Sequence, residues 1–160
     1  MKYLLLVLCL FAPTLKAQDW QTLMRHQATT SLEQALKDGD KTQFLHIKKT
    51  ILTPAQLQSI GKLKNLKVLK LNKTGINVLG EWLYQLENLQ VLDLSFNKLG
   101  ALPPGFAQLT KLKLLTLNNN FFTDVPPAIR NMASLEKVML KGNALVAIIP
   151  KGKYPFEVVW

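Results

Sequence analysis

A leucine recurs every 23 residues along the middle of the chain, at Leu66, Leu89, Leu112 and Leu135. Each of these leucines is followed by apolar residues three, five and ten positions later, and by an asparagine or threonine eight positions later. A fixed period of this length is typical of stacked repeats, in which no single copy buries a core by itself. The period therefore predicts an elongated stack of coils, each made of one strand and one returning segment.

Residues 89–99 show the frame most clearly, as L-x-x-L-x-L-x-x-N-x-L with Asn97 at its polar position. In this frame and its period the chain resembles the leucine-rich repeat family. The resemblance implies an α/β, right-handed solenoid with a curved parallel sheet on its concave side. Short helical, 3-10 or extended segments would then form the convex side. Residues 42–145 are predicted to hold five repeats, the first a degenerate copy that contains Leu45 and Ile47.

The segments on either side of the repeats have separate predicted roles. Residues 1–17 combine a basic start, an apolar run and a small final residue, which is typical of a secretory signal peptide. Residues 18–30 are expected to be a polar lead-in. Residues 31–41 are expected to form an N-terminal capping helix, since Ser31 and Gln34 make a capping-box pattern. Residues 146–160 are interpreted as a C-terminal cap, with Tyr154, Phe156 and Trp160 over the final repeat.

The predicted signal peptide implies export. It contains the only cysteine, Cys9, so the mature chain would have no disulfide and would depend on repeat packing. That pattern favours a bacterial cell envelope, and it leaves the periplasm, the cell surface and the medium open. No transmembrane segment is expected in the mature chain.

The returning segments differ in their expected conformation. Residues 53–63 form a short helix in this prediction, because Thr53 can cap it and Pro54 suits its first turn. The pairs Pro103-Pro104 and Pro126-Pro127 favour 3-10 or extended segments. Residues 81–86 lack proline and are expected to be the more regular helix.

The polar position of the frame has its own physical explanation. Where a strand turns away from the sheet, its backbone groups lose their neighbours in the ladder. A buried amide side chain both donates and accepts hydrogen bonds, so stacked asparagines can satisfy these groups. Asn97, Asn120 and Asn143 are therefore predicted to form a structural ladder.

Catalysis finds little support in the sequence. It has two histidines, His26 and His46, and neither belongs to a recognisable catalytic or metal-binding motif. The chain is predicted to be no enzyme and to need no metal and no cofactor. Nucleic acid is also excluded as a partner, because Arg25 and Arg130 are the only arginines and form no basic strip.

The outward-facing residues of the strands are the candidate binding surface, because they form rows across the concave face. One row is apolar, and two explanations stay open: it contacts a partner, or its members only cover one another. Lysines gather near the N-terminal end, which leaves open an anionic ligand or a purely solubilising role. The residues predicted to contact a partner are Phe44, His46, Lys48, Lys70, Asn72, Val91, Asp93, Ser95, Phe96, Leu114, Thr116, Asn118, Met139 and Lys141.

These observations predict a non-catalytic module that recognises a protein partner through its concave face. Two alternatives remain: a structural scaffold of the envelope, and an inhibitor or regulatory partner of a surface enzyme. The resemblance implies a surface for binding and no particular ligand.

Overall fold

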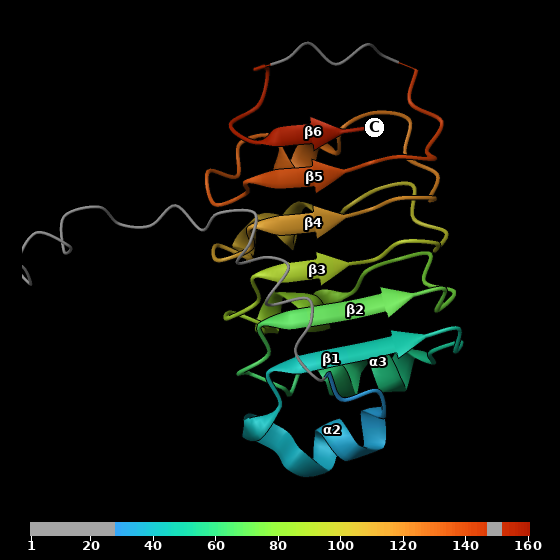
Figure 1. Cartoon of the computed structure of the whole chain (residues 1–160), viewed down its shortest axis with the longest axis vertical. Coiled ribbons are helices and arrows are strands. Elements are labelled where there is room, and N and C mark those ends of the chain that lie inside the picture. Colours follow the sequence, from blue (N-terminus) through green and yellow to red (C-terminus); the bar gives the residue numbers. More distant parts are fainter. Residues whose placement is uncertain (1–27, 147–151) are drawn as a thin grey trace, which may run out of the picture.

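The computed structural model describes residues 28–146 and 152–160 as one stack of parallel strands, with the returning segments behind the sheet and a further helix beyond its N-terminal end (Figure 1). The strands follow one another in space in their order along the chain, and every neighbouring pair is parallel. The predicted solenoid with a curved parallel sheet is thereby confirmed. Its strands are β1 (Phe44–Lys48), β2 (Val68–Asn72), β3 (Val91–Asp93), β4 (Leu114–Thr116), β5 (Lys137–Met139) and β6 (Glu157–Val159).

The sixth strand corrects the prediction of five. β6 comes from the segment that was interpreted as a cap, and it pairs with β5 so that Val158 lies beside Val138. This step is 20 residues long, whereas Leu92, Leu115 and Val138 follow one another at 23. Phe156 is buried just before the strand, and its ring stacks on Tyr154 with 5.5 Å between centroids. The cover expected from Trp160 is wrong, because that side chain is 54% exposed.

The returning segments are short, and most of them are 3-10 helices. The α-helical return is α3 (Pro54–Ile60), where Thr53 and Gln56 form both hydrogen bonds of a capping box. Residues 81–86, expected to be the more regular helix, contain the 3-10 helix η2 (Glu81–Gln85) instead. A five-residue segment that buries both Trp82 and Leu83 has little room for α-helical turns. The 3-10 helices that follow are η3 (Pro104–Gln108) and η4 (Pro127–Ile129).

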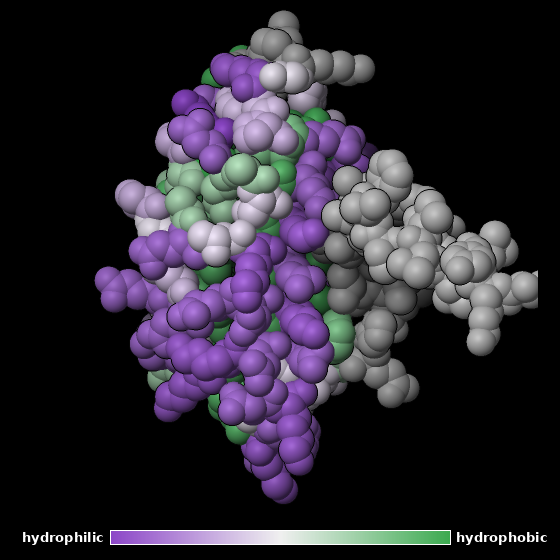
Figure 2. All heavy atoms as spheres, turned by 90° about the vertical axis from the view of Figure 1, so that its left-hand side faces the viewer, coloured by the Kyte–Doolittle hydropathy of each residue, from purple (hydrophilic) through white to green (hydrophobic). Residues whose placement is uncertain are grey.

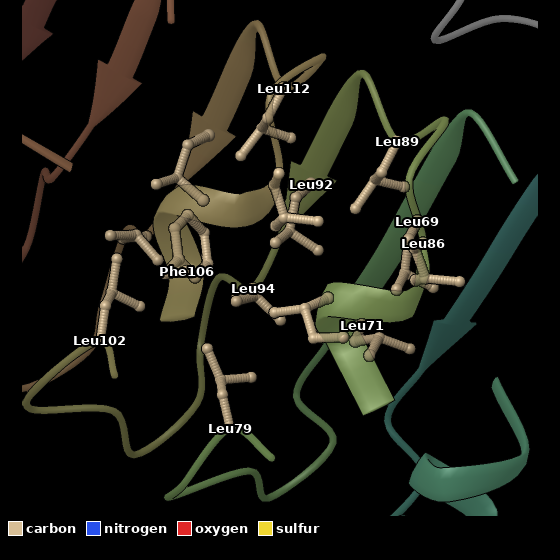
Figure 3. Close-up of a cluster of buried hydrophobic side chains, with 14 of the residues drawn as sticks. Leu69, Leu71, Leu79, Leu86, Leu89, Leu92, Leu94, Leu102, Phe106 and Leu112 are labelled. Carbon is tan, nitrogen blue, oxygen red and sulfur yellow. The ribbon is translucent and has the colours of Figure 1, made fainter. Parts of the chain in front are cut away.

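The main core lies between the sheet and these returns. Leu92 on β3 and Leu94 just after it face inward toward Phe106 from η3, and all three are fully buried (Figure 3). The same places are filled in each neighbouring coil, so the core runs along the stack. Burying an aliphatic side chain contributes about 1.5–3 kcal/mol, which makes this continuous core the main source of stability.

The three ladder asparagines hydrogen-bond across neighbouring coils. Asn97 Nδ2 donates to the carbonyl oxygens of Leu71 at 2.7 Å and Leu94 at 2.9 Å. Its Oδ1 accepts from the backbone nitrogens of Thr74 at 3.0 Å and Ile76 at 3.1 Å. Asn120 and Asn143 repeat both amide-to-carbonyl bonds one and two coils further on, and the Oδ1 of each accepts from one backbone nitrogen, that of Leu99 or of Phe122. The polar position of the frame therefore joins each coil to the one before it.

The N-terminal end of the stack is covered by the helix α2 (Leu32–Asp38) and the short 3-10 helix η1 (Gly39–Lys41). The Ser31 hydroxyl caps α2 by accepting from Gln34 N, while the Gln34 side chain donates to Asp38 and so leaves the box half formed. Before α2, Thr29 bridges to Leu45 on the outer edge of β1. The predicted signal peptide and most of the polar lead-in lie outside the described residues.

Candidate functional site

The outward-facing rows of the concave face follow from the register of the strands. His46, Lys70 and Asp93 lie side by side on β1, β2 and β3, and Thr116 and Met139 continue the row. Beyond the strand ends, the backbone of each coil turns through a left-handed conformation at the residue before the ladder position. The residues in this conformation are Lys49, Lys73, Phe96, Asn119 and Gly142, with φ of 57°, 56°, 58°, 54° and 74°.

The apolar row is buried and forms a second cluster, separate from the main core. Val68, Val91 and Leu114 have exposed fractions of 2%, 0% and 6%, and Phe44 and Met139 pack against them half-buried. Their expected exposure as a contact surface is therefore wrong for Val91 and Leu114. Branched and apolar side chains in register on adjacent parallel strands contact one another and bury their own surface.

Two polar residues of the predicted surface are also buried. The Ser95 hydroxyl donates to Asp93 Oδ1 at 2.6 Å, and the Thr116 hydroxyl lies 3.8 Å from Met139 Sδ. Further along, Asn118 Oδ1 accepts from the backbone nitrogen of Lys141 at 2.8 Å. The polar side chains of the C-terminal half of the concave face are therefore largely engaged in contacts within the protein.

The N-terminal half of the concave face is different, because it contains a hollow of about 510 Å³ in which four of the eight lining residues are lysines. We call it the basic hollow. It brings together six of the predicted contact residues, and it adds Lys49 and Lys73 from the left-handed turns. Its lining residues are His46, Lys48, Lys49, Lys70, Asn72, Lys73, Asp93 and Phe96.

Contacts inside the basic hollow fix several of these side chains. The Lys73 ammonium lies 4.7 Å from the centroid of the Phe96 ring, a cation–π contact between neighbouring coils. His46 Nε2 lies 3.1 Å from Asn72 Oδ1. Burial lowers the pKa of Lys70, and the nearby carboxylate of Asp93 acts in the opposite direction. The lining of the hollow thus includes a partly desolvated lysine and an aromatic ring.

Other surface features of the described residues have fewer charged or reactive side chains. A hollow of about 920 Å³ on the convex side, between η3 and η4, is lined by small and apolar residues such as Ala107, Ala128 and Met132. Within residues 28–146 and 152–160, no three histidine, cysteine, aspartate or glutamate side chains gather as metal ligands. No helix in these ranges has the length and apolar character needed to cross a bilayer.

Comparison with known proteins agrees with the repeat geometry. A family model described as "Leucine-rich repeat region" matches residues 23–145, which is most of the chain. The chain is a leucine-rich repeat protein. Among solved structures, it is similar to a leucine-rich repeat protein of Leptospira interrogans, with 28% sequence identity and a TM-score of 0.62. That match covers 83% of this chain and 34% of the Leptospira chain, so the present chain spans about a third of that protein. No curated protein sequence matches the chain.

This leucine-rich repeat protein has a second polar ladder, which the sequence reasoning missed. It lies where the strands begin, the edge that faces the viewer in Figure 2, where hydrophilic side chains predominate in the lower half. Asn65 Nδ2 donates to the carbonyl of Asp40, and Asn88 Nδ2 to that of Lys64, both at 3.0 Å. Lys111 Nζ then donates to Asn88 Oδ1 at 2.7 Å. The signal was present, since Asn65, Asn88 and Lys111 each precede the first leucine of a repeat.

Proposed function

We propose that this leucine-rich repeat protein is a non-catalytic module that is exported and binds another protein through the concave face of its sheet. The family suggests a protein-interaction module in general terms. The observation that supports the concave face is the basic hollow. It brings together charged side chains and the half-exposed ring of Phe96, none of which belongs to the hydrophobic core.

The chemistry of the hollow supports binding more than turnover. His46 lies against the amide oxygen of Asn72, and the contacts described for it include neither a carboxylate nor a nucleophile. Asp93 has one oxygen occupied by the backbone and hydroxyl of Ser95. Asn72 can orient the imidazole of His46, but a general base also needs a reacting group within reach, and the contacts of His46 supply none.

Phe96 is the residue whose loss tests recognition most directly, because it is 49% exposed at the side of the hollow. In crosslinking and mass spectrometry on the native envelope, we expect the wild-type protein to give one saturable partner. Phe96→Ala should reduce that crosslink about tenfold, since exposed aromatic anchors often dominate binding energy.

Phe121→Ala is the matched control, because Phe121 is a phenylalanine with 64% exposure that does not line the hollow. It should leave the crosslink unchanged. Equal loss in both variants would contradict recognition by the concave face. Weak crosslinks to many envelope components, insensitive to both variants, would instead favour a scaffold.

Export is tested on the mature chain itself. If residues 1–17 are a signal peptide, the protein recovered from the producing cells should begin at Gln18 and should lie outside the cytoplasm. Mass determination of the intact protein and cell fractionation measure both. A cytoplasmic protein that retains Met1 would contradict this part of the proposal.

A further inference from the structure

The basic hollow carries an excess of positive charge that the described fold does not neutralise. Four lysines line it against one carboxylate, that of Asp93. Ion pairs in the described part of the chain occur elsewhere, between Lys113 and Glu136, Arg130 and Asp124, and Lys137 and Glu157. None of the four lysines takes part in them. Like charges held close together repel, so an anionic ligand would relieve a cost that the free protein carries.

The four lysines of the hollow come from the coils of β1 and β2, and the coil of β3 contributes none. Lys48 and Lys49 stand at the end of β1, and Lys70 and Lys73 on and after β2, whereas β3 contributes Asp93 at the corresponding place. Asp93 is held there because its Oδ1 accepts from the backbone nitrogen and the hydroxyl of Ser95. The site therefore ends at β3, because a carboxylate of the ligand placed there would be repelled by the carboxylate of Asp93.

Among the four lysines, the charged form of Lys70 would be stabilised most by a bound anion. It is half-buried, and the burial that lowers its pKa is only partly offset by Asp93. At the side of the hollow, Lys73 stands over the ring of Phe96, so the charge of this lysine and an apolar surface are presented together. Both features favour a ligand that carries negative groups on a partly apolar chain.

We propose that the basic hollow binds a short acidic segment of the partner protein, with its carboxylates over β1 and β2. This inference depends on the proposed recognition of a protein. Lysines act as separate point charges, and adjacent strands lie about 4.8 Å apart, so several spaced carboxylates fit the site better than one compact phosphate. Arginine suits bidentate phosphate binding, but the arginine in the described chain, Arg130, is paired with Asp124 away from the hollow.

The test is a binding measurement on the purified protein with fluorescein-labelled hexaglutamate, and with labelled hexaglutamine as the neutral probe. We expect hexaglutamate to bind and to weaken as salt rises from about 50 to 300 mM, because exposed charge pairs are screened. Replacing Lys48, Lys49, Lys70 and Lys73 together by glutamine should weaken it about tenfold or more. Asp93→Asn should strengthen it about two- to fivefold by removing the opposing charge while keeping an oxygen for Ser95.

The matched control removes the same number of charges elsewhere. Its four substitutions to glutamine are at Lys37, Lys41, Lys62 and Lys98, which are exposed and do not line the hollow. This variant should bind hexaglutamate within about twofold of wild type, since the lost charges act only at long range. Circular dichroism on all variants checks that each one is folded.

Several outcomes would overturn the inference. Equal binding of the two peptides, equal loss in the control variant, or weaker binding by Asp93→Asn would each do so. Inorganic phosphate and phosphatidylglycerol vesicles are tested in the same way. If either binds more tightly than hexaglutamate and with the same dependence on the lysines, the ligand is a phosphate group and the acidic peptide is rejected. A partner that still crosslinks to the lysine variant but is lost in Phe96→Ala would refute the acidic segment and leave the proposed function intact.

Discussion

Asn97→Ala is expected to lower the free energy of unfolding by about 3–5 kcal/mol, because two buried backbone N–H groups lose their acceptor, at about 1–3 kcal/mol each, and two buried carbonyls lose a donor. The backbone nitrogens of Thr74 and Ile76 lose their acceptor. The carbonyls of Leu71 and Leu94 each lose one donor and keep another, from the hydroxyl of Thr74 and the amide of Asn120. No water replaces the amide easily, since Asn97 is only 7% exposed. Equilibrium denaturation in urea measures the change.

Asn97→Thr gives an internal comparison. Thr74 occupies the ladder position one coil earlier, and its hydroxyl donates to the carbonyl of Leu71. A threonine at position 97 should therefore keep part of the bonding and lose less stability than alanine. Asn131→Ala is the control, because Asn131 is exposed, and it should change stability by less than about 0.5 kcal/mol. If Asn97→Ala were as mild as the control, the ladder would be irrelevant to stability.

Phe106→Ala is the second large effect, also expected at about 3–5 kcal/mol, the usual range for removing a fully buried phenylalanine. Its ring points from η3 into the interior and is 0% exposed (Figure 3). Its backbone hydrogen bonds to Pro103 and Leu109 do not depend on the side chain, so the loss reports the core alone. The cavity would lie between coils, and the denaturation midpoint should fall accordingly.

Two further variants separate burial from residue type. Phe106→Leu should lose less than the alanine variant, since most of the buried volume is kept. Phe121→Ala removes the same side chain from a site with 64% exposure and should cost less than about 0.5 kcal/mol. Similar losses at positions 106 and 121 would mean that the interior is not packed as described.

The repeated leucines determine most of this architecture in advance. Leu69, Leu92 and Leu115 fall at one period, and a parallel sheet places such residues side by side. The sixth strand was missed because its step is shorter and it lacks the repeat frame: Val158 is its one counterpart to these leucines. The helix type of residues 81–86 was missed because a segment this short has no strong periodicity to read.

The candidate site was less predictable. Alternation along a strand shows which side chains face outward, but it does not show which of them are then covered. Val91 and Leu114 illustrate this, since both face outward and both are buried. The left-handed turns were also hidden, because Lys49, Lys73 and Phe96 are not glycine and carry no sequence signal for positive φ.

These turns have an evolutionary consequence. A left-handed backbone costs about 1–2 kcal/mol for most residues with a side chain, and less for asparagine and aspartate, whose short side chains hydrogen-bond locally. The protein already tolerates a lysine, a phenylalanine and an asparagine at this place in successive coils. Exchanging lysine and phenylalanine for one another at this place should therefore leave folding almost untouched while it alters the side chains on the surface. Natural selection can therefore change the surface at these positions independently of the leucines that hold the stack together.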